Sequence, residues 1–160
     1  MHNGNALDRL GQLRSNTHKL VRDFSDPNPA VPAQPLKKIL LAFELRWKLE
    51  ELVLMPALKD TQGMMLCGTR DAQRELLALR RLASLAREEG STADRNDVLL
   101  SAIDTLASLR TQRVSLALTR GEQAGVVNLS ALGLAMDQLL ARSNGDAASA
   151  AARGNLQAVS

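Results

Sequence analysis

The chain has 160 residues, of which 45% are hydrophobic, 2% aromatic and 23% charged, and its formal net charge is +3. This length suits one domain with a buried core, and apolar content dominated by Leu and Ala predicts helices, since strands favour branched and aromatic residues. Basic and acidic residues are interspersed and almost no aromatic ring could stack on a base, so the composition argues against nucleic-acid binding.

The cellular compartment can be predicted from three features. Cys67 is the only cysteine, so no internal disulfide can form, which fits a reducing compartment. No apolar run approaches the roughly 20 residues needed to span a bilayer. The polar start, Met1 to Asn5, lacks the apolar core of a secretory signal. We therefore expect a cytoplasmic protein without a membrane segment.

The first predicted helix covers residues 6–24. At about 100° per residue its inward positions share one face, and they are Leu10, Leu13, Thr17, Val21 and Phe24. The next segment, residues 25–35, contains four of the five prolines and is predicted to be an extended connector.

The second predicted helix covers residues 35–58 and begins at Pro35, a residue that is favourable in a first helical turn. Pro56 is expected to kink this helix or end it early. Both faces are apolar, which indicates either full burial or a second partner surface. We expect a protein partner or a second copy of the chain to bind the outer face, formed by Leu41, Leu45, Leu49 and Leu52.

Three more helices are predicted, over residues 69–88, 93–120 and 128–142. The helix over 93–120 has an inward stripe of Leu99, Ile103, Leu106, Val114 and Ala117. From residue 143 to 160 the sequence is low in complexity, and we expect a disordered tail. The whole pattern predicts an all-α domain over residues 1–142, an up-down four-helix bundle with a short C-terminal fifth helix and a flexible tail.

Charged residues interrupt the inward stripes of two of these helices. Glu50 breaks the stripe of the second helix and Arg110 that of the fourth, while Arg46 lies one turn before Glu50, at a spacing that lets the two interact. A charge inside an apolar stripe is costly unless it is paired. The pattern predicts a buried Glu–Arg network. The alternative is a tilted bundle in which the same residues form an exposed salt bridge.

Several segments resemble the hemerythrin-like, or HHE cation-binding, family. In its signature a helix carries His, then Glu four residues later, then Pro six further on, and RWKLEELVLMPAL matches at Glu50 and Pro56, with Arg46 in place of the His. THKLVRDF is similar to the first family helix, with His18 at the ligand position. DAQRELLALRRL is similar to the stretch around the third-helix His, with Gln73 in its place. NLSALGLAMDQLLA is similar to the short closing helix, so the resemblance covers residues 7–142.

The resemblance implies a hemerythrin-like bundle, in which family members hold two irons with about five histidines and two carboxylates on facing helices. Only His18 and Glu50 stand at matching ligand positions here, since Arg110 replaces another His and Val114 stands at the acidic position. Guanidinium groups repel a divalent cation and cannot become ligands. We therefore expect no bound metal and a metal-free, hydrogen-bonded cluster of His18, Arg46, Glu50, Gln73 and Arg110.

Other reactive side chains are interpreted as structural. Cys67 follows the apolar Met64 and Met65 and is expected to be a buried thiol rather than a reactive one. Helical phase places Asp104 and Glu75 on the surface, where they could not rebuild a carboxylate site. The sequence has no glycine-rich phosphate loop and no readable Ser-His-Asp arrangement. We therefore expect no enzymatic activity.

Three functional hypotheses are consistent with these observations. The leading one is a non-enzymatic, hemerythrin-like bundle without metal, which acts through protein contacts as a regulator or accessory subunit. The second is a metal-binding or redox- and oxygen-sensing protein with iron as cofactor and a reduced ligand set that uses His18 and Glu50. The third is an unrelated helical chaperone or adaptor, for which the proline-rich connector is the supporting feature.

Overall fold

The computed structural model describes residues 4–28, 30–31, 35–59, 69–88 and 92–158, with side chains described for all of these except 69–71 and 146–158. Every regular element within these ranges is a helix, which confirms the predicted all-α class. Met64, Met65 and Cys67 lie outside the described residues, as do parts of the proline-rich connector. None of the helices described is both long and apolar enough to cross a membrane.

Helix α1 (Ala6–Ser25) begins at a capping box. The Asp8 backbone N–H donates to Asn5 Oδ1 at 3.1 Å, and the Asn5 N–H donates to Asp8 Oδ2 at 3.0 Å. This reciprocal pair satisfies backbone donors that a helix start leaves without partners. The helix buries Ala6, Leu10, Thr17 and Val21, so its inward face largely matches the predicted one.

Helix α2 (Leu36–Leu49) passes directly into a π-helical turn, η1 (Glu50–Leu54), and then into α3 (Met55–Lys59). The Met55 N–H donates to the Glu50 carbonyl, five residues back, as a π turn requires. Pro56 comes next; it has no N–H, and in a regular helix its ring crowds the carbonyl four residues earlier. The wide turn accommodates this proline, so the helical path continues to Lys59 and does not end early.

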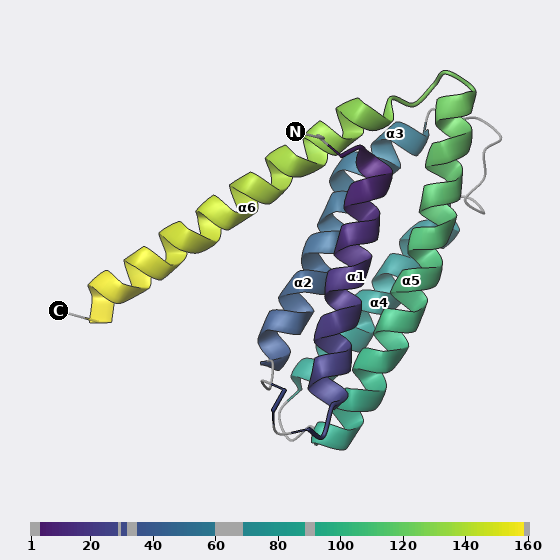
Figure 1. Cartoon of the computed structure of the whole chain (residues 1–160). Coiled ribbons are helices and arrows are strands. Elements are labelled where there is room, and N and C mark those ends of the chain that lie inside the picture. Colours follow the sequence, from purple (N-terminus) through teal and green to yellow (C-terminus); the bar gives the residue numbers. More distant parts are fainter. Residues whose placement is uncertain (1–3, 29, 32–34, 60–68, 89–91, 159–160) are drawn as a thin grey trace.

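Helices α4 (Thr69–Arg87) and α5 (Ala93–Gln123) complete a body of helices that lie side by side, with successive ones running in opposite directions (Figure 1). Both α2 and α5 pack against α1 and α4. At the start of α5, Thr92 Oγ1 accepts a hydrogen bond from the Arg95 N–H at 3.2 Å, a typical N-cap. We call α1, α2 to α3, α4 and α5 the helical body.

The core of the helical body contains two apolar clusters. The first includes Ile39, Phe43, Trp47, Leu79 and Ile103. The second includes Leu10, Leu49, Leu54, Val114 and Leu118, and it is completed by Met136 from outside the helical body. On α1 and α5, the buried polar residues Thr17 and Arg110 lie between residues of the two clusters. On the second helix the first cluster ends at Trp47 and the second begins at Leu49, and the buried Arg46 and Glu50 lie on either side of this junction. Polar side chains therefore form a layer between two apolar ends.

The predicted outer face of the second helix is smaller than expected. Leu41 and Leu52 are exposed and Leu45 is half-buried, but Leu49 is fully buried in the second apolar cluster. Helix α6 (Leu129–Ala158) packs against both α2 and η1. The second apolar face of α2 is therefore partly covered by the chain itself.

Helix α6 crosses the end of the helical body where α1 begins and then extends beyond it (Figure 1). Gly133 allows a close approach, since a Cβ there would lie 2.7 Å from the Gly4 carbonyl oxygen. Arg9 Nη2 on α1 donates to Asp137 Oδ2 on α6 at 2.8 Å. The helix continues past Arg142, where a disordered tail was predicted. The alanine-rich sequence explains the difference, because Ala has the highest helix propensity.

Candidate functional site

A polar layer in the middle of the helical body is the candidate functional site. Arg46 from α2, Glu50 from η1 and Arg110 from α5 are 3%, 2% and 3% exposed. The structure thus brings together three of the five residues that were predicted to form a cluster. Side chains with this burial and charge require partners, and their contacts define what the layer can do.

Arg110 joins three helical elements. Its Nε donates to Glu50 Oε2 in a buried ion pair, and its Nη1 donates to the Ala72 carbonyl of α4 at 2.8 Å. The same Nη1 lies 3.8 Å from Glu75 Oε1, and Glu75 also pairs with the half-exposed Arg113. The exposed salt bridge considered as an alternative is therefore wrong for Glu50 and Arg110.

Arg46 is held by hydroxyl and carbonyl oxygens. Its Nη1 donates to Thr17 Oγ1 on α1, while its Nη2 donates to Thr111 Oγ1 at 2.8 Å and to the Ala107 carbonyl at 3.4 Å on α5. Its Cζ lies 5.6 Å from the centre of the Phe43 ring, within the range of a cation–π contact. Arg46 therefore ties α2 to α1 and α5.

Burial is the main electrostatic influence on the layer. It raises the pKa of Glu50 above its ordinary value of 4.5, and the attraction of Arg110 and Arg46 offsets part of that rise. Burial also lowers the pKa of Arg46 below its ordinary value, against the opposing attraction of Glu50 and Asp104. The folded protein therefore holds the Glu50 proton more tightly than an exposed glutamate would.

His18 lies outside the layer, contrary to the prediction. Its side chain is 63% exposed, and its Nδ1 is 2.7 Å from Asp104 Oδ2. Successive residues of a helix are rotated by about 100°, so the neighbouring Thr17 points inward where His18 was expected. Thr17 supplies a hydroxyl oxygen to Arg46, which a family-based search for imidazole ligands would not detect.

Gln73 is also placed outside the layer. It is exposed on α4, whereas the preceding residue, Ala72, is buried and accepts a hydrogen bond from Arg110 through its backbone. The predicted side-chain contact of Gln73 is thus replaced by a main-chain one. A backbone acceptor leaves no mark in the sequence, so this contact was not predictable from residue types.

Three further residues belong to the site although they were not predicted in it. Asp104 is 8% exposed rather than on the surface, Thr111 is 4% exposed, and Glu75 is half-buried. Helix α5 contacts both α1 and α4, so it buries two faces, and a single inward stripe could not describe it. The same difference leaves Leu106, which was predicted to face inward, 41% exposed.

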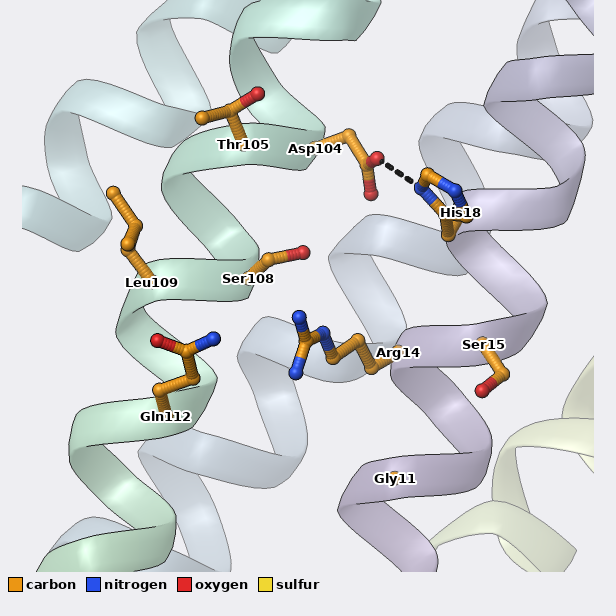
Figure 2. A pocket seen from close by; sticks show the side chains of 9 residues that line it. All are labelled: Gly11, Arg14, Ser15, His18, Asp104, Thr105, Ser108, Leu109 and Gln112. Atoms are coloured by element: carbon orange, nitrogen blue, oxygen red, sulfur yellow. Dashed lines mark hydrogen bonds and ion pairs between the residues drawn. The ribbon is translucent and has the colours of Figure 1, made fainter.

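Two grooves flank the polar layer. One has a volume of about 540 Å³, lies between α4 and the η1–α3 segment, and is lined by Gln73, Leu77 and Arg110 among others. The other, of about 630 Å³, lies between α1 and α5 (Figure 2). Arg14 and His18 line it from α1, and Asp104 and Ser108 from α5. Ligands or partners could approach the polar layer through either of these grooves.

The donor set does not fit the di-iron centre that the family resemblance implies. Within the residues that the structure describes, no three His, Cys, Asp or Glu side chains are grouped so that they could hold a metal ion. Arg46 and Arg110 have no lone pair to donate, and Glu50 is bonded to Arg110. His18, the other candidate ligand, contacts Asp104 at the surface.

Comparison of the chain with models of known protein families, with curated proteins and with solved structures finds no match. The resemblance to hemerythrin-like proteins is therefore one of residue pattern. The chemistry of the polar layer and of its two grooves is the basis on which a function can be proposed.

Proposed function

We propose that this chain is a hemerythrin-like, up-down four-helix bundle in which an arginine–glutamate layer replaces a metal centre. It acts in the cytoplasm through protein contacts, as a regulator or accessory subunit and not as an enzyme. The Arg110–Glu50 contact carries this proposal, because it uses the surviving carboxylate of the family pattern to neutralise a guanidinium.

The contacts of the layer support a structural role. Arg110 bonds to Glu50 and Ala72, and Arg46 bonds to Thr17 and Thr111. A general acid or base must come within hydrogen-bond reach of a substrate. Glu50 is 2% exposed and already bonded, so it cannot meet this requirement without unfolding of the layer.

The groove between α4 and the η1–α3 segment is the surface that we propose for partner binding. Leu77 lines it and is 63% exposed, and Leu52, which follows the groove-lining Glu51, is 60% exposed. Lys59 also lines it and has no ion pair among the described residues, whereas Arg80 pairs with Glu44 and Glu51, and Arg110 pairs with Glu50. A positive charge beside the exposed Leu77 favours an amphipathic partner helix that places acidic residues beside its apolar anchors.

The metal-free core is tested by elemental analysis of protein purified from iron- and zinc-supplemented cultures. We expect no stoichiometric metal and a melting temperature that a chelator leaves unchanged, because a native-state ligand would stabilise the protein by mass action. Stoichiometric iron or zinc, or a melt that falls on chelation, would instead support the competing sensor that uses His18 and Glu50.

The partner surface is tested with two synthetic amphipathic helical peptides that share apolar anchors and carry either Glu or Lys beside them. We expect saturable binding of the acidic peptide, weakened by Leu77→Glu or Lys59→Glu. Leu134→Glu on α6, where Leu134 is 57% exposed, is the matched control and should leave binding unchanged. Equal binding of both peptides, or no effect of Leu77→Glu, would contradict this surface.

A further inference from the structure

We propose that the groove between α1 and α5 binds a small organic carboxylate that carries a hydrogen-bond donor, such as an amino group, at its other end. This groove is distinct from the one proposed above for a partner helix. It has a volume of about 630 Å³ and is open to the surface along two adjacent helices (Figure 2).

Arg14 supplies the carboxylate-binding end. Its side chain is half-buried and extends from α1 toward α5, beside Ser108 and Gln112 (Figure 2). Within the described part of the chain, the Arg14 guanidinium makes no hydrogen bond or ion pair, and it lies near enough to Arg46 for the two cations to repel each other. An anion at Arg14 would relieve this repulsion, and a guanidinium matches a carboxylate with two parallel hydrogen bonds.

Asp104 supplies the donor-binding end. Its Oδ2 contacts His18 Nδ1 at 2.7 Å, while its Oδ1 has no hydrogen-bond partner among the described residues. A carboxylate that is nine-tenths buried needs more than one donor. Oδ1 is enclosed in the structure. The terminal torsion of an aspartate side chain has a broad energy minimum, so a modest rotation can expose one carboxylate oxygen to a ligand while the other stays in contact with His18.

Gly11 keeps the groove open. It lies inside α1, and no atom lies within 4 Å of the position that its Cβ would take. Close packing therefore does not require this glycine, although a mid-helix glycine costs about 0.5–1 kcal/mol relative to alanine. The missing side chain leaves space beside Arg14, one helical turn away.

The two ends of the groove are spaced for a short ligand. Arg14 and His18 are four residues apart on α1, and Asp104 and Ser108 are four residues apart on α5. Each pair spans ~6 Å of helix, which suits a chain of a few carbon atoms. The Arg14 guanidinium carries one positive charge, which balances one carboxylate but not a doubly charged phosphate. The nearby Asp104 carboxylate would repel the second negative charge of a phosphate, so the groove favours a carboxylate.

The proposal is tested by titrating the full chain with glycine, 3-aminopropanoate and 4-aminobutanoate, with butanoate, butylamine and inorganic phosphate as comparison probes. Binding is followed by amide NMR shifts. We expect saturable shifts in α1 and α5, strongest with 4-aminobutanoate and weak with butanoate or butylamine, since each of these lacks one end. No saturable shift, shifts outside this groove, or tighter binding of butanoate or phosphate would overturn the proposal.

Variants locate the site within the groove. Arg14→Gln should weaken binding by about tenfold or more, because it removes a charge-assisted bidentate contact. Gly11→Leu should block binding by placing a side chain in the groove, and its Cβ would meet no atom within 4 Å. Arg22→Gln, at an exposed position on the same helix, is the matched control and should bind as the wild type does. Unchanged binding in both Arg14→Gln and Gly11→Leu would contradict the proposal.

Discussion

Arg110 Nε donates a hydrogen bond to Glu50 Oε2 in an ion pair in which both side chains are only 3% exposed. The contact joins α5 to the π turn of η1, and the second bond of Arg110, to the Ala72 carbonyl, adds α4. A buried ion pair adds little net stability over apolar residues, but the loss of one partner is costly. We infer that the pair specifies how these helices align.

Removal of the carboxylate should destabilise the protein strongly. Glu50→Ala leaves Arg110 buried without its anionic partner and is expected to lower the free energy of unfolding by about 3–5 kcal/mol. Glu51→Ala is the matched control, because Glu51 is exposed and its ion pair with Arg80 is worth about 1 kcal/mol or less. Urea titrations of both variants measure the difference, and equal losses would show that burial of Glu50 has no energetic consequence.

Stability should depend on pH in a direction set by Glu50. Burial raises its pKa in the folded state, so the folded protein binds this proton more tightly than the unfolded chain. The stability gained from the proton is present below the ordinary pKa of 4.5 and is lost as the pH rises through the folded-state pKa. Glu50→Gln cannot titrate, so the stability of the wild type relative to this variant should fall as the pH rises above the ordinary pKa of 4.5. A difference that is constant or grows with pH would show that the pKa is not raised.

The hydroxyl groups that accept hydrogen bonds from Arg46 should contribute more to the free energy of unfolding than exposed hydroxyl groups do. Thr17→Val removes the acceptor of Arg46 Nη1 with little change in shape and is expected to cost about 1–3 kcal/mol, because it leaves a buried charged donor unsatisfied. Thr105→Val is the control, since Thr105 is exposed and its hydroxyl donates to the Ser101 carbonyl of its own helix. Its effect should stay within about 0.5 kcal/mol. Denaturation curves that rank the two variants equally would argue against the role assigned to Thr17.

Substitution by alanine at two glycine positions should change the stability of the protein in opposite directions. Gly133→Ala places a Cβ 2.7 Å from the Gly4 carbonyl oxygen, so α6 must shift away from the start of α1, and the melting temperature should fall. Gly11→Ala meets no atom within 4 Å and should stabilise α1 by about 0.5–1 kcal/mol. Thermal melts of the two variants test the packing of α6, which would be wrong if Gly133→Ala were neutral or stabilising.

The helices were largely predictable because each follows from local chemistry. The first was predicted over residues 6–24 and is Ala6–Ser25, and the fourth was predicted over 93–120 and is Ala93–Gln123. Apolar periodicity and capping residues act over a few positions, so they can be read directly from the sequence. The π turn was not predicted, because a proline shows that a helix must adjust without showing how.

The site was predictable only where a charge interrupts an apolar stripe. Glu50 and Arg110 met that criterion, Arg46 was added because it lies one turn before Glu50, and the structure places the three together. The prediction that His18 points inward was wrong by one residue of helical phase. The prediction that Asp104 lies on the surface was wrong because α5 buries two faces. Both errors come from tertiary packing. Packing determines which neighbours each face of a helix contacts, and apolar periodicity alone does not specify those neighbours.

A double-mutant cycle of Glu50→Leu and Arg110→Met tests most directly whether the polar layer is a paired network. Each single variant leaves one buried charge without its partner and should lose about 3–5 kcal/mol, whereas the double variant removes both charges. We predict that the double variant loses at least about 2 kcal/mol less than the sum of the single losses. Losses that add to within about 0.5 kcal/mol would contradict the pairing and, with it, the metal-free core proposed for this protein.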